Sequence, residues 1–142
     1  MTKRVMIVDD EPSITVPLKF LMEQNQFVVM VVHSGEAAIA TIDTFNPDLV
    51  LLDVMLPAAD GFQVCQHLRS DPSHKNIKVI FLSAMTRDLD IAKGNALGAD
   101  AYITKPFSNA ELIAKIRHLI GPGEDAEGEG PANKAGQTSV IR

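Results

Sequence analysis

Five short apolar runs, separated by helical patterns, constrain the fold of this chain most strongly. The runs are continuous, which is typical of parallel strands buried on both faces. Because a helical pattern follows each run, the chain is expected to form an α/β fold with a five-stranded parallel sheet and five helices. The predicted strands are residues 4–8, 27–32, 49–52, 78–82 and 101–104.

The helices are marked by capping residues and breaks. Ser34, Asp60 and Ser108 are predicted N-caps, the last two in capping boxes with Gln63 and Glu111. A proline inside the first helix is expected near its first turn, and Gly94 weakens the fourth helix, which we expect to be the least stable. The predicted helices are residues 13–25, 34–45, 60–70, 87–97 and 108–120.

Size and composition limit the class of protein. The chain has 142 residues and a net charge of −5, so composition gives no reason to expect direct binding to nucleic acid or membranes. No signal peptide or membrane-spanning run is evident, and Cys65 is the single cysteine, so a reducing cytoplasm is expected. Residues 1–120 are predicted to form one domain, and the acidic, glycine-rich residues 121–142 a flexible tail or linker.

Charged residues follow three of the predicted strands. Asp9 and Asp10 follow the first strand, Asp53 the third and Lys105 the fifth. The carboxyl ends of parallel strands lie along one edge of a sheet, so these four side chains are expected to converge. Any one acid could simply cap a helix, but three together suit Mg²⁺ and a phosphoryl group.

Two further residues fit this edge. Pro106 restricts the backbone of Lys105 and would aim its ammonium group reproducibly. Ser83 ends the fourth strand, where its hydroxyl either caps the chain or donates to the same phosphoryl group.

Four segments in this order resemble the receiver domain of a bacterial two-component response regulator, a CheY-like fold. They are VDDEP (8–12), LLDVMLPAADG (51–61), FLSA (81–84) and ADAYITKPF (99–107), and the resemblance covers residues 3–120. It implies a flavodoxin-like, doubly wound sheet of order 2-1-3-4-5, one of the few orders that right-handed crossovers allow.

The resemblance also implies a phosphoacceptor site. Asp53 would accept a phosphoryl group from a phosphohistidine on a sensor kinase or phosphotransfer protein. Asp10 would bind Mg²⁺ directly, Asp9 largely through water, and Met55 through its backbone carbonyl. The phosphoryl oxygens would be contacted by Lys105 and Ser83.

A switch pair is implied as well. Phosphorylation would draw Ser83 toward the phosphate and let Tyr102 turn inward, changing the surface of helix 4, strand 5 and helix 5, where a target protein or a second copy would bind. Tyr102 could also be simply a half-buried strand aromatic with its hydroxyl in water, which is compatible with the switch because the rotamer is what would change.

The loop after Asp53 departs from the family pattern. Residues 58 and 59 are both alanine, where the family often has glycine and then a larger apolar residue. Met55, Ala84 and Met85 border the expected route to the phosphate. We hypothesise that the two methionines limit the attack of water, although both could merely fill space.

Three other functions are compatible with parts of the pattern. A small-molecule phosphatase or phosphotransferase would need an acid–base group where the chain has Met55. A flavin carrier would need a phosphate-binding loop after the first strand, where the chain has two acids. A degenerate receiver would lack the complete acid, hydroxyl and lysine set. We therefore expect a phosphoacceptor signalling domain rather than an enzyme.

The output is less constrained. A stand-alone regulator is favoured slightly over a receiver module cut from a larger regulator with a C-terminal output domain.

The four histidines are expected at the surface or at helix ends: His33, His67, His74 and His118.

Overall fold

The computed structural model describes residues 2–124. Most of the predicted tail, residues 125–142, lies outside the described residues. Within residues 2–124 the chain forms five parallel strands and five α-helices, as the sequence predicts. The strands are β1 (Arg4–Val8), β2 (Val28–Val32), β3 (Leu49–Leu52), β4 (Lys78–Ser83) and β5 (Ala101–Thr104). Their order, β2-β1-β3-β4-β5, confirms the expected flavodoxin-like topology.

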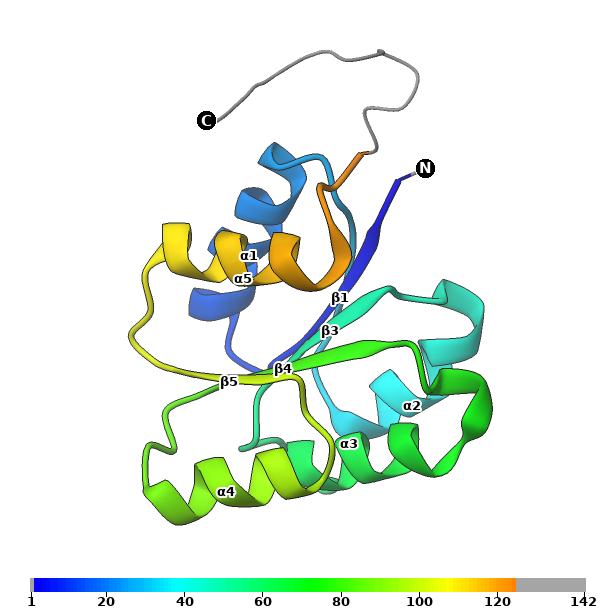
Figure 1. The fold of residues 1–142 in the computed structure, drawn as a ribbon, viewed down its shortest axis with the longest axis vertical. Coiled ribbons are helices and arrows are strands. Elements are labelled where there is room, and N and C mark those ends of the chain that lie inside the picture. Colours follow the sequence, from blue (N-terminus) through cyan, green and yellow to red (C-terminus); the bar gives the residue numbers. More distant parts are fainter. Residues whose placement is uncertain (1, 125–142) are drawn as a thin grey trace.

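The helices form one layer on each face of the sheet (Figure 1). On one face α1 and α5 cover an apolar core that includes Leu18, Met22 and Ile116. On the other face α2, α3 and α4 cover a second core around Phe81. The helices are α1 (Pro12–Gln24), α2 (Gly35–Phe45), α3 (Gly61–Ser70), α4 (Asp88–Ala96) and α5 (Asn109–Ile120).

The predicted caps are present, with small differences. Asp60 and Gln63 form the complete two-way capping box. At Ser108 the structure shows one half of the expected box, in which the hydroxyl accepts the Glu111 amide at 3.2 Å. Ser34 caps α2 by accepting the Ala37 amide.

Two local features differ from prediction. Helix α1 begins at Pro12, before the expected Ser13, so Pro17 lies inside the helix beyond its first turn. A short 3₁₀ helix, η1 (Pro72–His74), follows α3 and was not predicted. Three residues are too few for a helical periodicity to be visible in a sequence.

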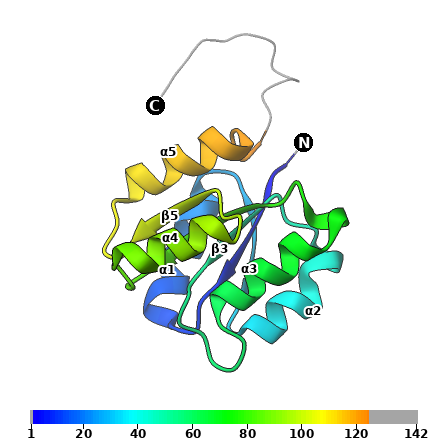
Figure 2. The same ribbon diagram turned by 60° about the horizontal axis from the view of Figure 1, so that its bottom comes forward.

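The register of the sheet aligns the residues that follow β1 and β3. Val8 pairs with Leu52, and the Asp53 amide donates to the Val8 carbonyl at 3.0 Å. Asp9 and Asp53 therefore leave adjacent strands at the same level. Figure 2 shows β3 and the loop that leads from it to α3.

The first residues of the predicted tail lie against the opposite edge of the sheet. Lys3 donates its amide to the Gly123 carbonyl at 2.6 Å, and Thr2 forms an antiparallel bridge with Glu124. A Cβ at Gly123 would collide with the backbone of Asn25 and Gln26, so this close approach requires glycine. The domain boundary at residue 120 remains a prediction.

Candidate functional site

Three carboxylates meet at the carboxyl edge of the sheet. Oxygens of Asp9, Asp10 and Asp53 lie within 4.8 Å of one another. Asp9 and Asp53 are buried, at 3% and 5% exposure, whereas Asp10 is open to solvent. The sequence prediction that these acids converge is confirmed.

Lys105 lies among these acids. Its Nζ is 2.9 Å from Asp9 Oδ2 and 3.6 Å from Asp53 Oδ2. Glu11, which sequence reasoning overlooked, is 3.9 Å away through Oε1. The Lys105–Pro106 peptide bond is cis. The lysine is held between carboxylates from two other strand ends, so its ammonium group partly offsets their mutual repulsion.

Backbone amides orient the two buried acids. The Glu11 amide donates to Asp9 Oδ1 at 2.9 Å, and the Met55 amide donates to Asp53 Oδ1 at 3.3 Å. Each amide lies two residues beyond its acid, in a loop that begins where the strand ends. The second oxygen of each carboxylate faces Lys105.

Burial and charge shift the pKa values of this site. Burial raises the pKa of Asp53, and the negative charge of Asp9 adds to this effect; Lys105, the Met55 amide and the Ser83 hydroxyl oppose it. Burial alone would lower the pKa of Lys105, but the hydrogen bond that its ammonium group donates to Asp9 and the charges of Asp53 and Asp9 raise this pKa. An ionised Asp53 is therefore costly, and an added cation would reduce this cost.

The donor set fits a hard divalent cation. Three carboxylates within 4.8 Å offer oxygen ligands of the type that Mg²⁺ prefers, and the exposed Asp10 leaves one side open to water or phosphate. A pocket of about 360 Å³ lies at this point, lined by Asp10, Glu11, Asp53, Met55, Ala84 and Lys105. This arrangement is consistent with a Mg²⁺ site.

Ser83 and Tyr102 are joined through a single residue. Ser83 is fully buried, and its Oγ accepts the Met85 amide at 3.2 Å. The Tyr102 hydroxyl donates to the Met85 carbonyl at 2.6 Å. Tyr102 is half-buried, as expected, but its hydroxyl donates to a backbone carbonyl and not to water. Its part in a switch stays a prediction.

Gly94 provides the space for the Tyr102 ring. A Cβ at Gly94 would lie 3.1 Å from ring carbons of both Phe81 and Tyr102. From sequence, Gly94 was expected only to weaken α4, because a contact with β4 and β5 leaves no local pattern. Glycine at this position lets the helix approach the two rings closely.

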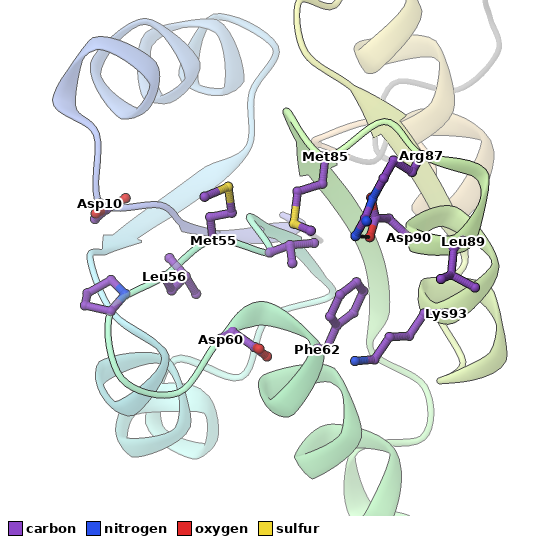
Figure 3. A pocket seen from close by; sticks show the side chains of 12 residues that line it. Asp10, Met55, Leu56, Asp60, Phe62, Met85, Arg87, Leu89, Asp90 and Lys93 are labelled. Atoms are coloured by element: carbon purple, nitrogen blue, oxygen red, sulfur yellow. Dashed lines mark hydrogen bonds and ion pairs between the residues drawn. The ribbon is translucent and has the colours of Figure 1, made fainter.

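A larger cleft adjoins this acidic pocket (Figure 3). It measures about 680 Å³ and shares Asp10 and Met55 with the smaller pocket. Met55 and Met85 both border this larger cleft, and Met55 is 64% exposed. The smaller acidic pocket is lined by Met55 and Ala84. Lys93 lies over the Phe62 ring at 4.6 Å on the α4 side.

Comparison with known families assigns the chain to a family. Residues 5–117 match the family described as the response regulator receiver domain. The chain belongs to this family. Receiver domains are phosphoacceptor signalling modules that partner histidine kinases, which agrees with the acidic site described above.

Full-length relatives of this receiver are longer. It is 44% identical over 125 residues to the sensory transduction protein RegX3 of Mycobacterium tuberculosis (strain ATCC 25618 / H37Rv), covering 88% of this chain and 54% of that protein. It is 38% identical to the alkaline phosphatase synthesis transcriptional regulatory protein PhoP of Bacillus subtilis (strain 168), covering 89% and 52%. The chain thus spans about half the length of these relatives.

A solved receiver shows the same fold. The receiver is similar to the BeF3-activated N-terminal receiver domain of Klebsiella pneumoniae RstA, with a TM-score of 0.77 and 29% identity, covering 82% of this chain and 97% of that one.

None of the helices within residues 2–124 has the length and apolar character needed to cross a membrane.

Proposed function

We propose that Asp53 accepts a phosphoryl group from a phosphohistidine on a partner kinase or phosphotransfer protein. The observation that carries this proposal is the convergence of Asp9, Asp10 and Lys105 on one buried carboxylate. An Asp53 oxygen attacks phosphorus as the P–N bond breaks, and the electron pair of that bond goes to the donor's imidazole. Protein residues act mainly by position and charge.

Each neighbour of Asp53 has a separate part in this reaction. The Met55 amide holds one carboxylate oxygen and leaves the other to face Lys105. The Lys105 ammonium group then binds an oxygen of the transferred phosphoryl group, which replaces the Asp53 oxygen as its partner. Ser83 supplies its hydroxyl to another phosphoryl oxygen when it releases the Met85 amide.

Asp9, Asp10 and the Met55 carbonyl would hold Mg²⁺ beside Asp53. When bound, the ion neutralises charge on the carboxylates and on the phosphoryl oxygens. Burial raises the pKa of Asp53, so the ionised carboxylate is costly at this position and a bound cation would reduce that cost. Asp10 is exposed and suits direct coordination, whereas Asp9 is tied to Lys105 and suits contact through water.

We further propose that the phosphoryl group changes the face formed by α4, β5 and α5. Ser83 accepts a hydrogen bond from the Met85 amide, and Tyr102 donates one to the Met85 carbonyl. Movement of Ser83 would therefore disturb the residue to which Tyr102 is bonded. A two-state equilibrium of this segment would be biased by the new bonds to phosphate. A target protein or a second copy of the chain would then bind this face.

The chemistry is tested by intact mass. The protein is incubated with Mg²⁺ and acetyl phosphate, and a gain of one phosphoryl group is expected for wild type but not for Asp53→Asn. Asp88→Asn, which removes an exposed carboxylate of α4, is the matched control and should react like wild type. No modification of wild type, or equal modification of Asp53→Asn, would overturn the assignment.

A second form of output is favoured by the length of the relatives. RegX3 and PhoP are about twice as long as the matched region, and PhoP is described as a transcriptional regulatory protein. In such an arrangement the receiver would control an attached output domain instead of a separate target. The size of the protein in its native cells, measured by immunoblot, distinguishes this case from a stand-alone receiver that acts in the cytoplasm.

A further inference from the structure

Met55 is the most exposed methionine within residues 2–124. It is 64% exposed, whereas Met6 and Met22 are completely buried. Met30 and Met85 are half-buried. A peroxide converts a methionine to its sulfoxide, and exposed methionines react first because the oxidant must reach the sulfur. Met55 is therefore the methionine that a peroxide in solution reaches most readily.

The cysteine of the chain is a weak competitor for the same oxidant. Cys65 is the single cysteine in the sequence, and it is fully buried in the core. Burial raises the pKa of its thiol, and the thiolate is the form that reacts with peroxides. Its Sγ also donates to the Leu97 carbonyl at 3.7 Å. Oxidation of this chain is therefore directed to Met55 and not to Cys65.

Met55 lies at the mouth of the pocket that contains Asp53. Its amide donates to Asp53 Oδ1 at 3.3 Å, which keeps residue 55 beside that carboxylate. Together with Asp53 and Lys105 it lines the acidic pocket of about 360 Å³, and together with Met85 it borders the larger cleft (Figure 3). Because the Met55 side chain is both exposed and part of the pocket lining, a change in its polarity acts where water reaches Asp53.

We propose that Met55 is oxidised by hydrogen peroxide, and that its sulfoxide shortens the lifetime of the phosphoryl group on Asp53. The second half of this inference rests on the function proposed above. In the oxidation, the sulfur forms a bond to one peroxide oxygen as the O–O bond breaks. The second oxygen takes the proton of the first and leaves as water, so the sulfur loses two electrons and the peroxide gains them.

The sulfoxide oxygen changes how the side chain interacts with water. A thioether sulfur is a weak hydrogen-bond acceptor, whereas a sulfoxide is polar and carries an oxygen that accepts well. In phosphoryl loss a water oxygen attacks phosphorus and releases a proton to solvent, while the bond from phosphorus to the Asp53 oxygen breaks and its electron pair returns to the carboxylate. An acceptor at the mouth of the pocket holds this water in position for the attack. Oxidation of Met55 thus replaces an apolar side chain by a group that binds water.

Peptide mapping of the full chain tests the site of oxidation. The protein is treated with hydrogen peroxide until a single oxygen atom has been added on average, as judged by intact mass. The oxidised peptides are then identified by mass spectrometry. Oxidation should be found at Met55 before Met6, Met22 or Cys65. Oxidation of Met6 or Met22 as fast as Met55 would overturn the assignment.

The lifetime is measured on the same oxidised protein. Catalase removes the peroxide, Mg²⁺ and acetyl phosphate supply the phosphoryl group, and its loss is followed by intact mass after the donor is removed. The half-life of oxidised wild type should be about threefold shorter than that of untreated wild type, which is the effect of one net hydrogen bond on the barrier. Reduction of the sulfoxide by methionine sulfoxide reductases should restore the original half-life.

Two variants separate Met55 from the other methionines. Met55→Leu keeps an apolar side chain without a sulfur atom, so peroxide should leave its half-life unchanged. Met30→Leu, which removes the half-buried methionine of β2, is the matched control and should respond to peroxide like wild type. An unchanged or longer half-life of oxidised wild type, or an equal response in Met55→Leu, would overturn the inference.

These outcomes are distinct from failure of the proposed function. In that case untreated wild type would gain no phosphoryl group from acetyl phosphate, and the effect on lifetime would be overturned together with the function. A protein that is phosphorylated normally but whose half-life does not respond to oxidation would overturn this inference alone.

Discussion

Replacing Asp53 with asparagine should stabilise the metal-free protein. Two unit charges within 4.8 Å of each other repel by at least about 3.5 kcal/mol at an effective dielectric constant of ~20. Asp53 is repelled by both Asp9 and Asp10. Its attraction to Lys105 at 3.6 Å, about 4.6 kcal/mol on the same scale, offsets little more than one of these two repulsions. The exposed Asp10 is screened by water, so about 1–2 kcal/mol of net penalty remains.

Thermal unfolding near pH 7 in EDTA measures this penalty. Asp53→Asn should raise Tm by roughly 4–10 °C, because asparagine keeps the shape and can still accept the Met55 amide. Glu36→Gln, an exposed acid in the first turn of α2, is the control and should leave Tm nearly unchanged. Mg²⁺ should raise the Tm of wild type more than that of Asp53→Asn.

The sign of the pH dependence follows from the raised pKa of Asp53. The folded state holds this proton more tightly than the unfolded state, so the penalty grows as pH rises from 3.8 through the raised pKa. Lowering the pH through this range should narrow the gap between Asp53→Asn and wild type. A lower Tm for Asp53→Asn near neutral pH, with Glu36→Gln unchanged, would refute the electrostatic account.

Three further predictions test other parts of the structure. Gly94→Ala should lower the free energy of unfolding by about 1 kcal/mol in urea titrations, because the new methyl group meets the Tyr102 ring. A higher free energy of unfolding, which helix propensity alone predicts, would contradict this contact. Ala58 has a φ of 59°, a backbone conformation that favours glycine. In the same titration Ala58→Gly should leave the free energy of unfolding unchanged or raise it by up to about 1 kcal/mol, whereas Ala59→Gly should lower it. The reverse order would exclude strain at residue 58. Met55→Asn should shorten the lifetime of the phosphoprotein, followed by intact mass after removal of the donor, and an unchanged or longer lifetime would show that Met55 does not limit the access of water.

The sheet and its acidic edge could be predicted because their signals are local. Each strand is a continuous apolar run, and each functional acid comes directly after such a run. Once the strand order is known, the register of β1 with β3 brings Asp9 and Asp53 together. The apolar runs and the residues after them predict the strands and the acidic edge, whereas the strand order was implied by the resemblance to the receiver family.

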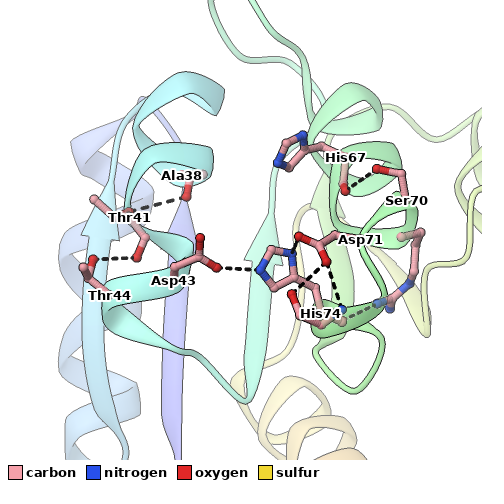
Figure 4. Close-up of polar contacts among 10 residues, drawn as sticks. Ala38, Thr41, Asp43, Thr44, His67, Ser70, Asp71 and His74 are labelled. Atoms are coloured by element: carbon pink, nitrogen blue, oxygen red, sulfur yellow. Dashed lines mark hydrogen bonds and ion pairs between the residues drawn. The ribbon is translucent and has the colours of Figure 1, made fainter.

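Contacts between distant elements could not be predicted in the same way. Glu11 is an acid like its neighbours, and its approach to Lys105 depends on loop conformation. His74 is buried in η1 and contacts Asp43 of α2 (Figure 4), and η1 was itself too short to predict. Gly94 was expected to weaken a helix, while its contacts with β4 and β5 arise only in the packed fold.

The position of Tyr102 gives the protein a built-in optical reporter. It is the only tyrosine in the sequence, and the chain has no tryptophan. Its phenol donates a hydrogen bond to a backbone carbonyl in the loop that connects β4 to α4. The intrinsic fluorescence of the unlabelled protein therefore comes almost entirely from the residue proposed to move, so a phosphorylation titration can be followed at that residue without attaching a dye.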